Sequence, residues 1–266
     1  MQAACCGDYQ PQSGGGPEDL ESRRASVARQ GVYADVVGAS AAHSVPREQR
    51  STQAISIDWS EQELLFRELT PHLQRAALFK VNTGMRQKEV CQLRWEWEQP
   101  VPELDTPEIK RTVFVLPEWV TKNKEARVVV LNDVAQRIVD ELRGQHPTYV
   151  FIWEDRKGRR RRFCRLNNSG WKAARRRAAA RYQQELGRPA PDGFRRVRVH
   201  DLKHTCGRRL RAAGVSLEDR QDILAHKTGR ITTHYSAPEI GNLVAAVNRI
   251  ANSRGIHART VLRLVA

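Results

Sequence analysis

Apolar residues recur at helical spacing through most of the chain from Ile57 onward. This pattern predicts helices over residues 59–84 (divided in two by Pro71), 86–95, 133–144, 167–187, 200–214, 216–226 and 238–253. The predicted N-caps of three of these helices are Ser60, Asn132 and Ser216.

Short runs of β-branched and aromatic residues follow the first helices. Residues 93–98 (LRWEWE), 111–117 (RTVFVLP) and 126–132 (ARVVVLN) are predicted strands separated by Pro- and Lys-rich turns. Residues 149–153 predict another short strand, and the basic run over 155–163 predicts a solvated turn. Because alternating strand–helix–strand units and internal repeats are lacking, we expect an α+β fold. It is mainly α-helical, with a small antiparallel three-stranded sheet.

The charge balance narrows the class of partner. The 45 Lys and Arg residues exceed the 30 Asp and Glu residues, which gives a formal net charge of +15 and a pI near 10.2. Such a balance indicates a polyanionic partner, most simply nucleic acid. The sequence contains neither an apolar run long enough to span a membrane nor a secretory signal pattern. Five cysteines without C-x-x-C spacing favour a reduced, intracellular protein.

Residues 1–55 differ in composition from the rest of the chain. They are rich in Gly, Ser, Pro and polar residues, and we expect a disordered or atypical segment with one helical turn over 22–27. Residues 56–252 are the expected globular domain, and 253–266 the expected tail.

Side chains suited to phosphate chemistry occur at Arg86, at Lys122, at His200 with Lys203, and at His226 with Tyr235. Taken singly, each has an ordinary explanation, such as a helix start, a solvated turn or a packed aromatic ring. His200 and Lys203 are expected on the face of their helix opposite its apolar stripe. His200 and His204 also have metal-ligand spacing, which leaves a metallohydrolase open, although HDLKH lacks the Glu that a zincin uses.

Taken together and in this order, the four places resemble the tyrosine recombinase (phage integrase) family. NTGMRQKEVCQLRW is similar to the family's first arginine box, with matching residues Gly84, Arg86, Glu89, Leu93 and Trp95. TKNKEARVVVL is similar to the hairpin that carries the catalytic lysine, matched by Lys122. HDLKHT resembles the His-x-x-Arg box, and LAHKTGRITTHYS resembles the box that joins the second His to the nucleophilic Tyr. The resemblance covers about residues 57–252.

The resemblance implies the catalytic fold of DNA breaking–rejoining enzymes and a site-specific recombinase of a phage or integrated mobile element. Tyr235 would attack phosphorus and form a 3′-phosphotyrosyl bond, which conserves the bond energy without ATP. Lys122 would protonate the departing 5′-oxygen. No metal and no other cofactor is implied, because fixed cations would neutralise the charge of the transition state.

The other matched residues would meet the phosphate. Arg86 offers a planar fork to the non-bridging oxygens, and His200 and His226 can donate further hydrogen bonds. His200 would also manage the proton of the tyrosine, and Glu89 would orient Arg86.

Two features depart from the family pattern. Lys203 stands where the family usually has its second catalytic arginine, so the clamp could be shared with Arg198 or Arg208 nearby. Residues 1–55 do not resemble the family's N-terminal core-binding domain. The alternative is therefore a truncated, catalytically impaired DNA-binding remnant of an integrase.

The expected partner is double-stranded DNA carrying attachment sites. The expected contacts with the DNA backbone come from basic runs that contain Arg160, Arg161, Arg162, Arg175 and Arg176. By resemblance, four subunits act together on DNA, with a C-terminal segment docked on a neighbour and a possible accessory DNA-bending protein. The expected location is the bacterial cytoplasm, on the nucleoid when DNA is bound.

Overall fold

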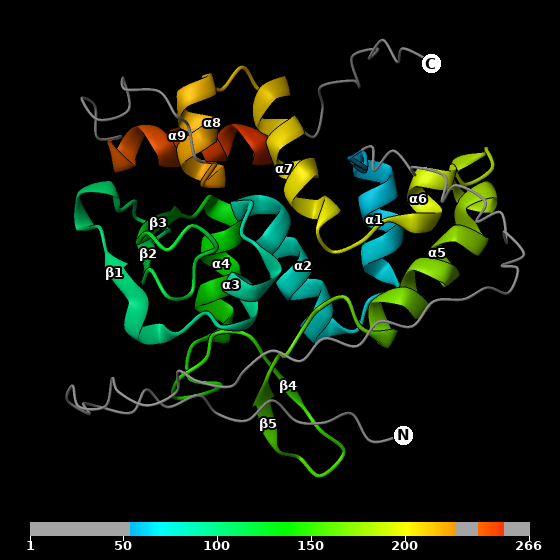
Figure 1. Cartoon of the computed structure of the whole chain (residues 1–266), viewed down its shortest axis with the longest axis horizontal. Coiled ribbons are helices and arrows are strands. Elements are labelled where there is room, and N and C mark those ends of the chain that lie inside the picture. Colours follow the sequence, from blue (N-terminus) through cyan, green and yellow to red (C-terminus); the bar gives the residue numbers. More distant parts are fainter. Residues whose placement is uncertain (1–53, 227–238, 253–266) are drawn as a thin grey trace, which may run out of the picture. The chain divides into compact units, whose positions relative to one another are not determined.

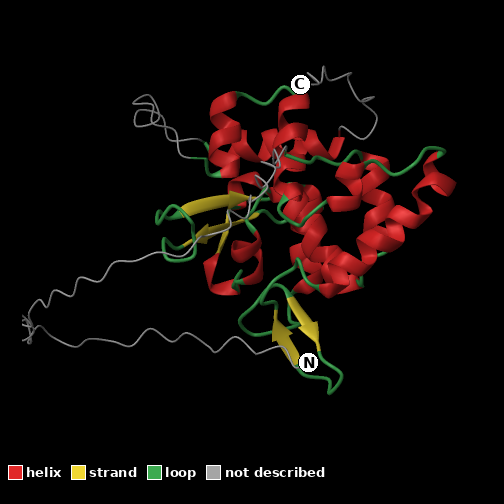
Figure 2. Cartoon of the chain, turned by 45° about the vertical axis from the view of Figure 1, so that its right-hand side comes forward, coloured by secondary structure: helices red, strands yellow, loops and turns green. Residues whose placement is uncertain are grey.

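The structure is a computed structural model that describes residues 54–226 and 239–252 (Figure 1). In these ranges the chain forms α-helices and a three-stranded antiparallel sheet, which confirms the predicted α+β class. A second, two-stranded sheet forms a separate hairpin that was not predicted (Figure 2). None of the helices described is long and apolar enough to cross a membrane.

The helices are α1 (Trp59–Arg67), α2 (Pro71–Thr83), α3 (Gln87–Cys91), α4 (Asp133–Leu142), α5 (Ser169–Leu186), α6 (Asp192–Arg196), α7 (Asp201–Ala212), α8 (Leu217–Leu224) and α9 (Ile240–Asn252). The strands are β1 (Glu98–Pro100), β2 (Thr112–Leu116), β3 (Arg127–Val130), β4 (Ile152–Glu154) and β5 (Arg160–Arg162). Two 3₁₀ turns, η1 (Trp95–Trp97) and η2 (Pro102–Leu104), flank β1.

The first helix is capped by Asp58, and the prediction of Ser60 was wrong. Asp58 Oδ1 accepts a hydrogen bond from the backbone N–H of Glu61 (2.7 Å), and Glu61 Oε2 accepts one from the N–H of Asp58 (3.0 Å). This reciprocal capping box satisfies two backbone donors, so the helix begins before Ser60. The other two predicted caps, Asn132 and Ser216, are confirmed.

The three-stranded sheet has the order β1-β2-β3. β2 and β3 fall inside predicted strands, but the strand predicted over 93–98 was wrong, because only Glu98 of that stretch belongs to β1. The indole of Trp95 donates to the carbonyl of His146 (3.0 Å), and Trp97 is buried. Both rings therefore anchor the turn η1 and do not alternate along a strand.

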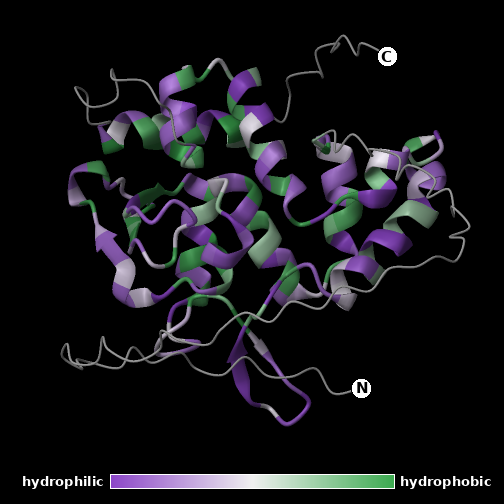
Figure 3. Cartoon of the chain, viewed as in Figure 1, coloured by the Kyte–Doolittle hydropathy of each residue, from purple (hydrophilic) through white to green (hydrophobic). Residues whose placement is uncertain are grey.

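The basic run over 155–163 is part of a hairpin, so the predicted solvated turn was only partly right. β5 pairs antiparallel with β4, and the turn between them is closed by Asp155. Its Oδ1 accepts hydrogen bonds from the N–H groups of Lys157 (2.9 Å) and Arg159 (3.0 Å). The hairpin is hydrophilic along most of its length (Figure 3).

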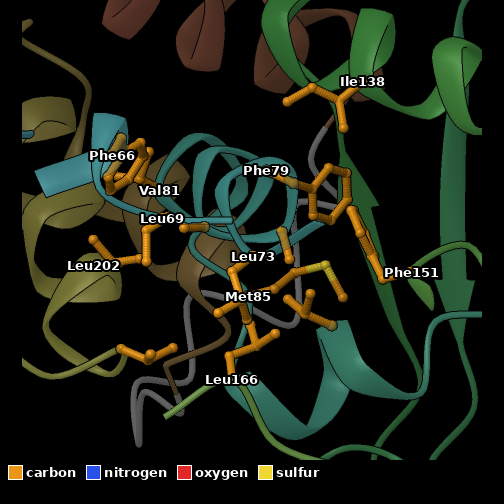
Figure 4. Close-up of a cluster of buried hydrophobic side chains, with 14 of the residues drawn as sticks. Phe66, Leu69, Leu73, Phe79, Val81, Met85, Ile138, Phe151, Leu166 and Leu202 are labelled. Carbon is orange, nitrogen blue, oxygen red and sulfur yellow. The ribbon is translucent and has the colours of Figure 1, made fainter. Parts of the chain in front are cut away.

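Helix α2 lies at the centre of the core and contacts α1, α3, α4, α7 and α9. Phe79 of α2 is fully buried and packs on Phe151 with ring centroids 4.9 Å apart (Figure 4). A second apolar cluster includes Cys206 of α7, Ile223 of α8 and Val247 of α9. Helices α7, α8 and α9 therefore pack as a group beside α2 and the sheet.

Gly84 follows α2 and lets α8 approach closely. Its φ of +64° is a left-handed conformation that favours glycine. A Cβ at this position would lie 2.5 Å from Leu224 Cδ2 and 3.3 Å from Cys206 Sγ. The absence of a side chain here allows Leu224, the last residue of α8, to lie against the turn that ends α2.

Candidate active site

Three cationic side chains converge on the carbonyls at the C-terminal end of α8. The donor–acceptor pairs are Arg127 Nη2 to Ile223 O (2.9 Å), Lys203 Nζ to Leu224 O, and Arg86 Nη2 to Ala225 O (3.1 Å). The last carbonyls of a helix lack intrahelical partners and carry the negative end of its dipole, so they attract cations. The end of α8 thus gathers side chains from β3, α7 and the start of α3 directly before His226.

A buried carboxylate, Glu89 of α3, lies between two of these cations, and its side chain is 1% exposed. It accepts hydrogen bonds from Arg86 N (2.8 Å), Arg86 Nη1 (3.1 Å) and Arg127 Nη1 (3.1 Å). Burial disfavours the ionised carboxylate, but Arg127 and the two Arg86 donors outweigh it and lower the pKa of Glu89. A charged Glu89 therefore holds Arg86 and Arg127 together.

Lys203 does not lie on a solvent-facing surface of α7, and that prediction was wrong. The apolar stripe of α7 is confirmed by the burial of Leu202 and Cys206, but α8 packs on α7 as well and leaves Lys203 only 5% exposed. Burial, followed by the charges of Arg127 and Arg86, lowers the pKa of Lys203 to about 7. The ammonium group loses its proton far more readily than that of a surface lysine.

His200 and His226 are both exposed at the edge of this cluster. His200 precedes α7, and partial burial together with the neighbouring His204 lowers its pKa. His226 follows α8, and partial burial together with Lys203 lowers its pKa. Both rings are therefore mainly neutral at pH 7, and each can donate one N–H to a phosphate oxygen.

Lys122 is carried by the loop between β2 and β3, residues 117–126. The hydroxyl of Thr121 stabilises this loop, because it accepts a hydrogen bond from Glu125 N (3.2 Å) and lies 3.1 Å from Glu118 O. Lys122 is exposed and lines a cavity of about 700 Å³ to which Arg86 also contributes. The structure thus brings the predicted lysine and the predicted arginine to the same cavity.

Sequence reasoning missed Arg127 and Lys80. The side chain of Arg127 is only 8% exposed. The sequence signal that could have indicated this residue is its position as a single cation directly before the apolar run VVVL. Lys80 is fully buried on the apolar face of α2 and donates to Met85 O. Burial lowers the pKa of Lys80 to about 8, and the charge of Glu89 is the main effect that opposes this shift. A lysine at the helical spacing of core residues was the signal in this case.

The two arginines considered as a second clamp have other partners. Arg198 donates to the carboxylate of Asp201 (3.2 Å), and Arg208 donates to Ser56 Oγ (2.7 Å). Arg127 is the arginine whose charge acts most strongly on Lys203. Arg127 of β3 and Lys203 donate to the successive carbonyls Ile223 O and Leu224 O, so the guanidinium that accompanies Lys203 comes from β3.

The predicted nucleophile, Tyr235, lies outside the described residues. The rings of His200 and His204, which have metal-ligand spacing, meet edge to face with centroids 4.9 Å apart. Within residues 54–226 and 239–252, no group of three or more His, Cys, Asp or Glu residues could hold a metal ion.

The arginines predicted to contact DNA lie on two surfaces. Arg160, Arg161 and Arg162 form β5, where Arg161 Nε lies 3.3 Å from Asp155 Oδ2. Arg175 and Arg176 belong to α5 and line a groove of about 550 Å³ between α5 and α6. The lining of this groove consists of cations and alanines: Lys172, Arg175, Arg176, Ala179, Ala180 and Arg195.

Residues 60–240 match the phage integrase family, so the chain belongs to this family. One curated relative is the integrase of Salmonella phage P22, which is 26% identical over 171 residues. The match covers 61% of this chain and 38% of the relative, so the chain spans well under half of the length of that integrase.

Two solved structures of the integrase of transposon Tn1549 are also similar to this chain. The complex with circular intermediate DNA has a TM-score of 0.43 and 14% identity, and the match covers 75% of this chain and 66% of that one. The complex with transposon right-end DNA has a TM-score of 0.43 and 14% identity, and the match covers 77% and 68% of the two chains.

Proposed function

We propose that this protein is a site-specific recombinase of a phage or integrated mobile element, which cuts and rejoins DNA through a phosphotyrosyl bond at Tyr235. The observation that carries the proposal is the convergence of Arg86, Lys203 and Arg127 on the end of α8, directly before the segment that contains Tyr235. Three cations gathered at one point suit a phosphodiester whose charge increases in the transition state.

The scissile phosphate would lie against Arg86, with His200 and His226 donating to its non-bridging oxygens. Arg86 has one nitrogen on Glu89 and another on Ala225 O, so its planar group is already oriented. Holding the donor in place before DNA binds removes a reorganisation cost from the reaction.

In the proposed reaction, Tyr235 Oη attacks phosphorus as the bond from phosphorus to the 5′-oxygen breaks. His200 would take the proton of the tyrosine, and Lys122 would give a proton to the departing 5′-oxygen. Rejoining is the reverse reaction, in which a 5′-hydroxyl attacks the phosphotyrosyl bond. Because that bond conserves the energy, no cofactor is required.

The proposed DNA backbone contacts are the basic groove on α5 and the β4–β5 hairpin. The groove contributes Lys172, Arg175, Arg176 and Arg195, whereas Arg161 of the hairpin shares its charge with Asp155. We therefore expect the groove to account for more of the salt dependence of DNA binding. Four copies on paired attachment sites, an accessory DNA-bending protein and a location in the bacterial cytoplasm belong to the same proposal.

The test is formation of a covalent adduct. A binding site is first selected from random-sequence duplex DNA, and duplexes nicked at successive positions across it are then incubated with the protein. We expect an SDS-resistant protein–DNA adduct with the wild-type chain and none with Tyr235→Phe, although the variant still binds DNA. Tyr149→Phe is the matched control and should form the adduct, since Tyr149 contributes its ring to Arg94 (5.5 Å) and the ring is retained.

An adduct formed by Tyr235→Phe would assign the nucleophile to another residue. DNA binding by the wild-type chain without an adduct on any nicked duplex would support the alternative, a DNA-binding remnant of an integrase.

A further inference from the structure

Trp119 is a large apolar side chain that is 54% exposed. It belongs to the turn after β2 and lines the same cavity of about 700 Å³ as Arg86 and Lys122. Most tryptophans of a folded chain bury their rings, so an exposed indole at a cationic cavity points to a ligand with an apolar face.

The ring of Trp119 is held in place although it is exposed. It meets Trp97 edge to face, with centroids 5.6 Å apart and an interplanar angle of 77°. The guanidinium of Arg94 lies over the ring at 5.8 Å. The turn itself is closed by hydrogen bonds from Val120 N to Pro117 O (3.1 Å) and from Thr121 N to Glu118 O (3.2 Å). The indole is therefore a preorganised platform.

Trp119 and Lys122 line the same cavity, which indicates which nucleotide would meet the ring. The proposed role of Lys122 is to protonate the 5′-oxygen at the break, and Trp119 lies three residues earlier in the same loop. When the strand is cut, the base next to the new 5′-hydroxyl is no longer linked through the scissile phosphate to its neighbour. A base that can leave the stack there can stack on a fixed aromatic ring.

We propose that Trp119 binds the nucleobase on the 5′-hydroxyl side of the break by stacking. The inference rests on the proposed recombinase function and adds a base-binding subsite to it. The phosphate is an unsuitable ligand for the neutral indole, whereas every base has a π face. The contact would therefore hold the cut end near the phosphotyrosyl bond without strong preference for sequence.

The test is a double-mutant cycle between protein and DNA, in which all proteins also carry Tyr235→Phe so that no strand is cut. The selected binding site is nicked at successive positions, and the nucleotide bearing the 5′-hydroxyl is either normal or abasic. At the nick position bound most tightly, Trp119→Ala should weaken binding of the normal duplex by about 5- to 150-fold. Trp119→Phe should weaken it less.

On the abasic duplex, Trp119→Ala should have almost no effect, because the stacking partner is already missing. Val115→Ala is the control, since Val115 is also exposed and apolar but lies on β2 outside the lining of the cavity. It should leave the affinity for both duplexes unchanged.

An equal loss of affinity on the normal and abasic duplexes would overturn the proposal and assign Trp119 to protein packing. No loss on either duplex would overturn it as well. The test does not require cleavage, so it can fail while the wild-type chain still forms the adduct, and the two proposals are judged separately.

Discussion

Replacing Glu89 with Gln should destabilise the fold strongly, because it removes the charge that holds two buried or half-buried arginines together. The side chain of Glu89 is 1% exposed, and it accepts three hydrogen bonds from Arg86 and Arg127 at 2.8–3.1 Å. Glutamine has one acceptor oxygen and an NH₂ group that would face an arginine. At least one charge-assisted bond is lost, and Arg127 is left buried without its counter-charge.

Removing one partner of a buried ion pair costs about 3–5 kcal/mol. We expect the lower end of this range, about 3 kcal/mol, because Arg127 keeps its bond to Ile223 O and Arg86 keeps its bond to Ala225 O. The control is Glu96→Gln, which removes a 3.0 Å pair with Arg94 in which the glutamate is 59% exposed. That change should cost under about 1 kcal/mol.

In the assay, circular dichroism monitors the urea unfolding of wild type and of both variants at several pH values from 3 to 7. The pKa of Glu89 is lowered in the folded protein, so its contribution is complete above the carboxyl pKa of the unfolded chain, about 4.3. The contribution is lost as the pH falls through the folded pKa, and the difference between Glu89→Gln and wild type should shrink there. A loss under about 1 kcal/mol at pH 7, or a loss that does not change with pH, would refute the assigned role of the charge.

Two further predictions concern the same region. The pKa of Lys203 is lowered to about 7, so the lysine loses its charge as the pH rises while an arginine would keep it. We therefore expect the single-turnover cleavage rate of Lys203→Arg, divided by that of wild type, to increase between pH 7 and 8.5. The increase should be up to about tenfold per pH unit. A ratio that does not change with pH would contradict the titration of Lys203. Gly84→Ala should cost about 1–3 kcal/mol more than Gly144→Ala in urea unfolding. Both glycines have positive φ (64° and 75°), but only at Gly84 would a Cβ meet Leu224, whereas nothing lies within 4 Å of one at Gly144. Equal losses would mean that α8 can move away.

The hydrophobic pattern was sufficient for most of the fold because helical periodicity is a local property. The helices α1 and α2, the strands β2 and β3 and the long helix α5 all follow from residues close in sequence. The first strand was misplaced because Trp95 makes its decisive contact with His146, 51 residues away. Contacts of that kind have no signature in a short window of sequence.

Motifs in the sequence identify candidate site residues, but they do not report which of those side chains the fold buries. Arg86, Lys122 and His226 were identified from family boxes, and the structure brings Arg86 to the cavity of Lys122 and to the end of α8. The burial of Lys203 depends on the packing of α8 against α7, which periodicity along α7 alone does not report. Arg127 was missed for the same reason, since its partners come from α3 and α8.

The contacts at the end of α8 have a consequence for the order of folding during synthesis. Arg86 and its carbonyl acceptor are separated by 139 residues, and Arg127 and its acceptor by 96 residues. A growing chain that has not yet reached α8 can already contain the sheet and the basic groove. It still lacks the carbonyl groups at the end of α8 to which Arg86, Arg127 and Lys203 donate. Closing such long loops is slow and comes late in folding. The proposed active site is therefore completed only after α8 has been synthesised, later than the sheet and the basic groove on α5.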